Sequence, residues 1–427
     1  MIPVTLIALL VLMALAIPVA ASMGVLALFL EAVYSQLPLV RAMGEVAWSA
    51  SNEFLLVSVP LFILLGEILL RSGFAERMYG SLIHWVSWLP GGLMHSNIAA
   101  CAMFAATSGS SVATAATVGT VALPQARRFG YNERLFLGTL AAGGTLGILI
   151  PPSINMIVYA VLTNTSVPKL YLAGMIPGLV LCGLFMLTVV LLCWARPAWG
   201  GKRMGATWHQ RFEGLVHLLP PLGIFLVVVG SIYAGVATPT EAASLGVVAA
   251  LGLAWWKGRL TLDMLREAVE GTMRSTAMVM LIFVAAYFLN FVISAIGLTT
   301  LLTSFIEQLG LTPGWMLFAV IVFYVILGCF METLSMMITT IPIIAPVMFK
   351  LGYDPIWFGI LIILLIETAL VTPPVGLNLF VVQNLRKSGS LNDVIIGTLP
   401  FVATLFAMLA LLSFVPGLAT WLPAQFG

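Results

Sequence analysis

Two adjacent prolines interrupt an apolar stretch in the first half of the chain, where residues 147–155 read GILIPPSIN. A second pair lies in the second half, where residues 371–378 read VTPPVGLN. Proline lacks a backbone N–H and clashes with the preceding helical turn, so neither stretch can form an unbroken helix. Inside a membrane, backbone without helical partners is tolerated only where it is buried in protein or faces a polar cavity.

The composition places both breaks in a membrane protein. Hydrophobic residues make up 61% of the 427 residues and charged residues 8%, and apolar runs long enough to cross a bilayer recur along the chain. No polar stretch is long enough for a separate soluble domain. The sequence predicts an all-α polytopic membrane protein with about ten transmembrane helices, expected near residues 2–21, 23–40, 53–71, 134–162, 170–194, 214–234, 239–256, 271–294, 355–384 and 391–415.

Two further apolar stretches, residues 93–124 and 314–349, are too long for one helix and carry small or polar residues near their middles. Each arm has about 15 residues, or ~22 Å at the helical rise per residue, which is shorter than the ~30 Å core of a bilayer. We therefore expect two re-entrant helical hairpins with their tips inside the membrane, at residues 107–111 (TSGSS) and 328–335 (GCFMETLS).

Basic residues fix the orientation of this arrangement. Of the 18 lysine and arginine residues, all but Arg41, Lys169 and Lys350 fall on one side of the predicted membrane. Because lysine and arginine concentrate in cytoplasmic loops, that side is predicted to be the cytoplasm, and both termini are expected on the outer side of the membrane.

The chain also repeats itself. A shift of about 222 residues places Gly130-Tyr131 on Gly352-Tyr353 and the first proline pair on the second. The repeats are expected to span residues 53–194, with the hairpin 93–124 and the broken helix 134–162, and residues 271–415, with the hairpin 314–349 and the broken helix 355–384. Residues 195–270 supply a cytoplasmic loop and linking helices. One hairpin enters from inside and the other from outside, so the repeats are inverted, as in many secondary transporters.

An amphipathic stretch at residues 74–88 precedes the first hairpin and carries Trp85 and Trp88. Such a segment is typical of a helix that lies in the membrane interface. Residues 298–309 occupy the equivalent place in the second repeat.

The two tips and breaks differ in charge. The first tip and break offer hydroxyl and carbonyl oxygens only, which suit Na⁺, whereas the second pair adds Glu332 and Glu367. An ionised Glu in hydrocarbon is costly, so both are candidates for a cation site or a proton-linked group. Two alternatives stay open: small-residue packing at the first tip, and structural hydrogen bonding by the two carboxylates.

Other chemistry finds no support in the sequence. No phosphate-binding loop, zinc-protease motif or nucleophile elbow is present, so neither enzymatic activity nor a cofactor is expected. The four cysteines lie in apolar segments without metal spacing. Glu241 follows Thr238 at the spacing of a helix N-cap, and the role of Glu67 stays open between helix packing, subunit contact and transport.

Several motifs occur together and in order: residues 108–110 (SGS), residues 147–153 with two prolines, residues 237–243 (ATPTEAA) and residues 372–378 (TPPVGLN). With these motifs the chain resembles, over essentially the whole length of the chain, the large membrane subunit of tripartite ATP-independent periplasmic (TRAP) transporters. One departure is Thr114, where many relatives have an acid.

The resemblance implies an elevator-type, Na⁺-coupled symporter that imports an organic acid, such as a C4-dicarboxylate or a sugar acid. It also implies two partners, a periplasmic substrate-binding protein and a small four-helix membrane subunit. Carried onto this sequence, the Na⁺ sites involve Ser108, Ser110, Pro151 and Asn155 in the first repeat and Gly328, Glu332, Thr333, Thr372 and Gly376 in the second. Substrate is expected near Ser108, Gly109, Ser111, Ser153, Thr333, Pro374 and Asn378, with Glu367 as a candidate coupling group.

Two other functions are compatible with the residues alone. The chain could be an ion-coupled anion symporter or exchanger that works without a binding protein, or an intramembrane enzyme with Glu332 and Glu367 as paired acids. The sequence names neither the substrate nor the Na⁺ stoichiometry.

Overall fold

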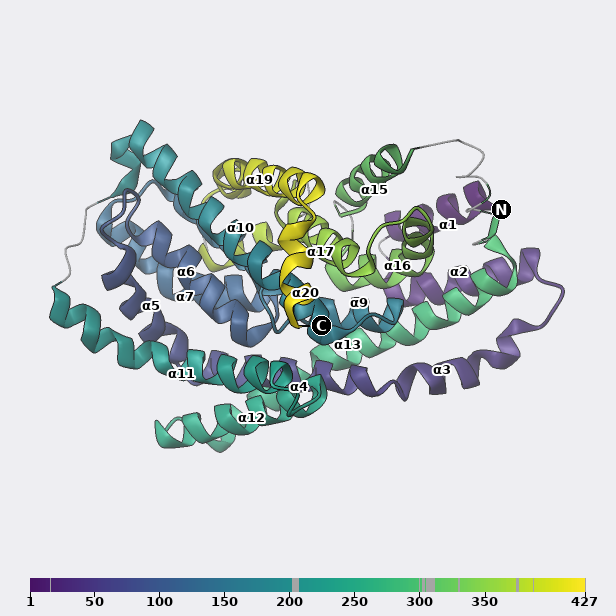
Figure 1. The fold of residues 1–427 in the computed structure, drawn as a ribbon, viewed down its shortest axis with the longest axis horizontal. Coiled ribbons are helices and arrows are strands. Elements are labelled where there is room, and N and C mark those ends of the chain that lie inside the picture. The colour runs from purple at the N-terminus through teal and green to yellow at the C-terminus, as the bar shows by residue number, and fades with distance from the viewer. Residues whose placement is uncertain are drawn as a thin grey trace.

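The computed structural model describes residues 1–15, 17–201, 207–298, 300–301, 304, 312–328, 331–373, 376–386 and 388–426. Within these ranges the chain forms nineteen α-helices and three short 3-10 helices, without a β-strand (Figure 1). The prediction of an all-α protein is therefore confirmed.

The helices of the first half begin with a divided N-terminal segment: α1 (Ile2–Ala14), α2 (Val19–Tyr34), α3 (Met43–Ser51), α4 (Ser58–Arg71) and α5 (Phe74–Val86). The predicted spans 2–21 and 23–40 are wrong in their boundaries, because the chain breaks before Pro18, which sits at the N-cap of α2. Helix α3 falls in a segment for which a loop is predicted. Helix α5 matches the predicted amphipathic helix.

Two sets of four helices correspond to each other under the sequence repeat. The first comprises α6 (Leu93–Ser108), α7 (Ser111–Phe129), α8 (Glu133–Leu149) and α9 (Ile154–Thr163), and the second comprises α15 (Pro313–Gly328), α16 (Thr333–Lys350), α17 (Pro355–Val371) and α18 (Leu377–Arg386). A shift of 222 residues carries the start of α7 onto that of α16, and both ends of α8 onto those of α17. The axes of α8 and α9 differ by 42° across the first proline pair.

The remaining helices are long: α10 (Val167–Ala195), α11 (Trp208–Tyr233), α12 (Pro239–Trp256), α13 (Leu262–Ala295) and α19 (Leu391–Phe414), followed by the short α20 (Gly417–Phe426). In Figure 1, the lower side of the molecule is formed by α3, α4, α11, α12 and α13, which lie below the two sets α6–α9 and α15–α18.

Fewer helices than predicted are long and apolar enough to cross a membrane. Among the described residues there are six, or seven if α8 and α9 count as one broken span, against the ten predicted. Helices α1 and α2 have only 13 and 16 residues. Helix α16, with 18 residues, is itself one of the six, so it is longer than the predicted hairpin arm.

Helices of the first repeat contact those of the second at several places, including a close helix crossing and a chain of ion pairs. Helices α8 and α19 cross so closely that a Cβ on Gly138 would collide with the backbone of Gly397, and one on Gly397 with the backbone of Arg134. An ion-pair chain lies at the same end, where Arg386 pairs with Glu133 (2.8 Å) and Asp393 (3.1 Å), and Asp393 pairs with Arg134 (2.9 Å).

Candidate functional site

The two hairpin tips and the two helix breaks meet at one cavity of about 380 Å³. From the repeats it is lined by Ser108, Gly109, Ser110, Ser111, Val112, Ala113, Ala116, Ile148, Ile154, Asn155, Glu332, Thr333, Leu334, Leu370 and Leu377. Helices α4 and α13 close the opposite wall with Ile63, Gly66, Glu67, Leu70, Ser275, Met278 and Val279. Segments far apart in the sequence thus share a single cavity, in which the polar residues of the tips and breaks lie among apolar side chains.

Hydroxyl groups order the first tip. Gly109 turns the chain with a φ of 62°, a conformation that favours glycine. The Ser110 hydroxyl then caps α7 by accepting a hydrogen bond from the Ala113 amide at 3.4 Å. Thr114 donates to the Ser110 carbonyl (2.7 Å), and its hydroxyl lies 3.1 Å from that of Ser108. Thr114 therefore serves the tip through its hydroxyl.

The first tip is seated directly on the first break. A Cβ on Gly147 would lie 2.6 Å from the Ser110 carbonyl oxygen, and one on Gly109 would lie 2.8 Å from the Pro152 carbonyl oxygen. Real Cβ atoms do not approach so closely, so glycine at these positions lets two backbones touch. The tip cannot shift sideways without losing these contacts.

At the first break, the Ser153 hydroxyl caps α9 and also donates to the Ile148 carbonyl at 2.6 Å. It is therefore satisfied by the backbone. Asn155 behaves differently, because its side-chain nitrogen is buried and makes no hydrogen bond within the described part of the chain. Since Asn155 also lines the cavity, its side-chain amide has hydrogen-bonding capacity left for a ligand there.

The second tip is capped by a carboxylate. Glu332 accepts hydrogen bonds from the Ser335 amide (3.0 Å), the Ser335 hydroxyl (3.2 Å) and the Thr333 hydroxyl (2.8 Å). It is the N-cap of α16 and a lining residue at once. Gly328, at the end of α15, packs directly on Ala369 of α17, which seats this tip on its own helix break.

At the second break, the Thr372 hydroxyl donates to the Thr368 carbonyl at 2.6 Å, and Gly376 has a φ of 38°. Pro374 lies outside the described residues. The Asn378 amide crosses to the first repeat, where it donates to the Ser111 hydroxyl (2.8 Å) and to the Ala141 carbonyl (3.1 Å). Asn378 therefore joins the second break to the first tip.

Glu367 lies in the middle of the repeats and is completely buried. Its carboxyl group faces the backbone of Leu149 at the first break, but neither oxygen makes a hydrogen bond of normal geometry to a described residue. It is not among the residues that line the cavity. Glu332 and Glu367 thus sit in different surroundings, one facing the cavity and one behind it.

The predicted site residues divide accordingly. The cavity is lined by Ser108, Gly109, Ser110, Ser111, Asn155, Glu332 and Thr333. Outside the lining stand Pro151, Ser153, Gly328, Glu367, Thr372, Gly376 and Asn378.

Sequence reasoning did not place Glu67 at the site. This residue lines the cavity from α4, and Arg71, one turn further on, holds its carboxylate at 3.1 Å and also pairs with Glu267 of α13. The neighbouring Gly66 approaches the tip closely, since a Cβ there would lie 3.4 Å from the Ser108 Cα. The pattern in the sequence that could have identified Glu67 as a site residue is an acid next to a glycine, Gly66, within a predicted transmembrane span.

Helix N-termini and two carboxylates contribute to the electrostatics of the cavity. Helices α7, α9, α16 and α18 all begin at residues that line it, so four positive dipole ends point toward one space. Glu67 and Glu332 are the formally charged side chains in the lining. The arrangement can hold an anion at the helix N-termini and a cation at the oxygens of the tips.

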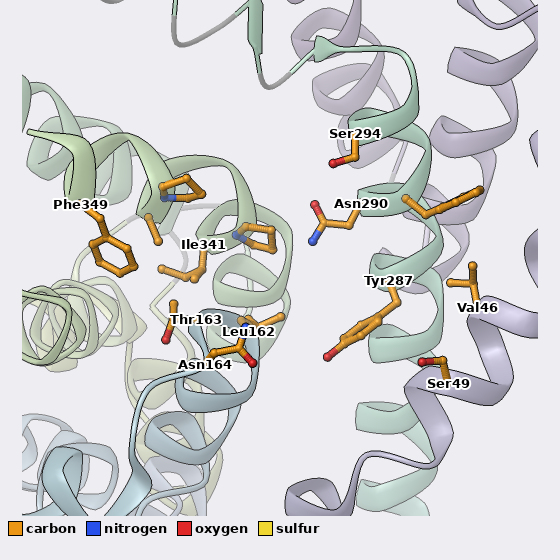
Figure 2. A pocket seen from close by; sticks show the side chains of 14 residues that line it. Val46, Ser49, Leu162, Thr163, Asn164, Tyr287, Asn290, Ser294, Ile341 and Phe349 are labelled. Carbon is orange, nitrogen blue, oxygen red and sulfur yellow. The ribbon is translucent and has the colours of Figure 1, made fainter.

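A second, larger cavity of about 720 Å³ lies beside the first. Figure 2 shows Tyr287, Asn290 and Ser294 of α13 facing Thr163 and Asn164 at the end of α9, with α3 and α16 completing the walls. None of the predicted site residues lines it. It lies between α3 and α13 on one side and α9 and α16 on the other.

Helices of membrane-spanning length, together with interrupted helices whose ends meet at a shared cavity, define a multi-pass membrane transport protein. Residues 6–418 match the model of the DctM component of tripartite ATP-independent periplasmic transporters. The chain therefore belongs to the DctM family of large TRAP permeases.

Similar proteins agree with this assignment. The C4-dicarboxylate TRAP transporter large permease protein DctM of Vibrio cholerae is 32% identical over 95% of this chain and 94% of its own length. The isethionate TRAP transporter permease protein DctMQ of Oleidesulfovibrio alaskensis is 30% identical over 94% of this chain, which spans 63% of that relative. In structure, the YdaH transporter of Alcanivorax borkumensis matches with a TM-score of 0.63 at 17% identity, over 97% of this chain and 98% of that one. This last likeness concerns the fold.

Proposed function

We propose that this large permease imports an organic acid together with Na⁺. The observation that carries the proposal is the convergence of four helix N-termini on one cavity whose charged lining residues are both acidic. Helix N-termini favour a carboxylate or sulfonate, whereas the oxygens of Ser108, Ser110 and Glu332 favour a cation. Binding both ions together cancels most of their charge, which is the physical basis of coupling.

The proposed cation ligands come from the tips and breaks of the two repeats. In the first repeat they are Ser108, Ser110, Pro151 and Asn155, of which Pro151 can offer only its carbonyl. In the second they are Gly328, Glu332, Thr333, Thr372 and Gly376. Glu332 already accepts three hydrogen bonds, so its carboxylate is oriented before any ion arrives.

We propose that one set of helices moves against the other along the boundary on which the two cavities lie. Helices α6–α9 and α15–α18 would move as an inverted pair against α3, α4 and α13, which is an elevator mechanism. The contact between Gly66 and Ser108 and the open space around Asn290 both lie on this boundary.

Two partners complete the proposal. A periplasmic binding protein would deliver the substrate, and a small membrane subunit would brace α4 and α13 within the bacterial cytoplasmic membrane, with both termini of this chain outside. The DctMQ relative, whose single chain is longer than this one, supports the need for a small subunit.

The direct test is uptake in proteoliposomes that contain this chain, its small subunit and its binding protein. We expect uptake to require an inward Na⁺ gradient, and equal uptake with K⁺ in place of Na⁺ would refute the coupling. Full activity of this chain alone would instead establish a symporter that needs no binding protein.

The substrate class is tested on the binding protein. C4-dicarboxylates, sugar acids and sulfonates can be compared by the rise in its melting temperature, because a ligand that binds the native state stabilises it. We expect a carboxylate to give the largest rise. A preference for an uncharged solute would contradict the anion site proposed here.

A further inference from the structure

A separate polar pocket lies between α5 and α11, away from the transport cavity. It encloses about 390 Å³ and is lined by Arg77, Gly80, Ser81 and His84 of α5 and by Gln210, Glu213, Gly214 and His217 of α11. On each helix the four residues follow a spacing of i, i+3, i+4 and i+7, which places them on one face. Two polar stripes therefore face each other across the pocket.

Small residues keep the middle of the pocket narrow, and long ones stand at its rim. A Cβ on Gly214 would lie 3.3 Å from the Ser81 Cβ, and the Ser81 hydroxyl turns back to the Arg77 carbonyl at 3.0 Å. Glu213 pairs with His209 at 3.7 Å. Arg77 forms no ion pair with another described residue, so its charge is available to a ligand.

The surroundings of the pocket are those of a membrane interface. Trp208 stacks on Phe212 with ring centres 6.2 Å apart, Phe212 meets Trp85 edge to face at 6.4 Å, and the Trp85 indole donates to the Arg211 carbonyl at 3.2 Å. Trp208 and Phe212 remain 66% and 59% exposed. Rings with an apolar body and a polar tip occupy the headgroup level of a bilayer.

Apolar surface continues from the pocket along α11. Leu215, Val216 and Leu219 of α11 are exposed, while Glu213 and His217 of the same helix line the pocket. A molecule that has a charged head and an apolar tail would meet both kinds of surface at once.

We propose that this pocket binds one phospholipid of the cytoplasmic leaflet by its phosphate. Arg77 supplies the cationic donor, and His84 and His217 supply imidazole N–H donors at the rim. Glu213 receives the ammonium group of an ethanolamine headgroup, so a zwitterionic lipid satisfies both signs of charge. The acyl chains lie along the exposed apolar face of α11.

Lipid binding at this pocket does not depend on the transport function proposed above. An effect of the lipid on uptake would depend on it. Helix α5 connects α4, at the wall of the transport cavity, to the first hairpin that begins with α6. A lipid held between α5 and α11 would therefore sit at the joint between the two sets of helices.

The test uses the purified full chain in detergent and follows its melting temperature while short-chain dioctanoyl phosphatidylethanolamine is added. Charge-assisted hydrogen bonds contribute about 1.5–3 kcal/mol, so Arg77→Ala is expected to raise the lipid concentration for half-maximal stabilisation by about tenfold or more. The matched control is Arg196→Ala, since Arg196 stacks on Trp199 at 4.5 Å and does not line the pocket. Should Arg77→Ala not fold, Arg77→Gln gives the same comparison.

Further measurements distinguish a lipid phosphate from a free phosphate ion as the ligand. Inorganic phosphate is expected to give no stabilisation, and an effect equal to that of the lipid would overturn the lipid assignment in favour of a free-anion site. Glu213→Gln is expected to weaken phosphatidylethanolamine and to leave phosphatidylglycerol unchanged. Equal losses in Arg77→Ala and Arg196→Ala would reduce the effect to general surface charge and refute the proposal.

Discussion

The two repeats share a helical skeleton but differ in how their tips are held. In the first, a hydroxyl caps α7 and the tip carries no formal charge, whereas in the second the Glu332 carboxylate caps α16. Both tips are seated by a glycine, Gly147 in the first and Gly328 in the second. The comparison shows that seating is common to both copies, while charge belongs to one.

The largest expected effect comes from unseating a tip. Gly147→Val would place a Cβ 2.6 Å from the Ser110 carbonyl oxygen, and overpacking of about 1–3 kcal/mol is expected to reduce uptake by roughly tenfold to a hundredfold. Gly183→Val is the control, since nothing lies within 4 Å of a Cβ there. Normal uptake by Gly147→Val at equal protein incorporation would show that close seating is dispensable.

Removing the charge of the second tip comes next. Glu332→Gln keeps an oxygen that can accept the Ser335 amide but removes the carboxylate, so the Na⁺ concentration for half-maximal uptake should rise by about tenfold, from a charged contact of about 1.5–3 kcal/mol. Glu241→Gln is the control, because Glu241 belongs to a capping box with Thr238. A Na⁺ dependence that is identical in Glu332→Gln and wild type would assign Glu332 to helix capping alone.

The asparagines that follow the two breaks allow a sharper comparison. Asn378 makes two hydrogen bonds to the first repeat, whereas the Asn155 amide makes none to a described residue. Asn378→Ala should therefore lower the free energy of unfolding by about 1–3 kcal/mol, as measured by thermal unfolding. Asn155→Ala should leave stability unchanged and, since Asn155 is a proposed cation ligand, raise the Na⁺ concentration for half-maximal uptake by roughly fivefold. A loss of stability in Asn155→Ala with unchanged stability in Asn378→Ala would instead make Asn155 the structural residue and Asn378 the ligand-binding one.

The smallest effects are expected from single hydroxyls. Ser110→Ala and Thr372→Ala should each raise the half-saturating Na⁺ concentration by about threefold, the effect of a neutral ligand worth ~0.5–1.5 kcal/mol. Thr372→Ser retains the hydroxyl and should restore the wild-type value. Unchanged Na⁺ dependence in both alanine variants would argue against oxygen ligation at these positions.

The helix interruptions were predictable because they depend on local chemistry. Proline and glycine stop a helix whatever surrounds them, and α8 ends at Leu149 and α17 at Val371, directly before the predicted breaks. The predicted cap at the start of α12 forms for the same reason, since its capping box needs only Thr238 as the N-cap and Glu241 three residues later.

Helix lengths were less predictable where polar residues continue a helix. Helix α13 begins at Leu262, nine residues before the predicted span, because Arg266 and Glu270 pair at 2.8 Å along one face. Such pairs support a helix without adding hydropathy. Conversely, α1 ends at Ala14, before Pro18, inside a run that hydropathy alone treats as one span to residue 21.

Contacts between the repeats required the three-dimensional structure. The sequence indicates that Ser111 and Asn378 matter, but not that they bond to each other, and it gives no reason to place Glu67 opposite the first tip. These relations depend on how α4, α7 and α18 pack, which no local pattern encodes.

The crossing of α8 and α19 at Gly138 and Gly397 offers a practical reference for spectroscopy. Where two backbones touch, no side chain can adjust, so the distance across this crossing should stay constant through a transport cycle. Spin labels placed on exposed positions a few turns from it would give an internal standard. Changes measured between α13 and α16 could then be read as displacement of one helix set against the other rather than as local distortion.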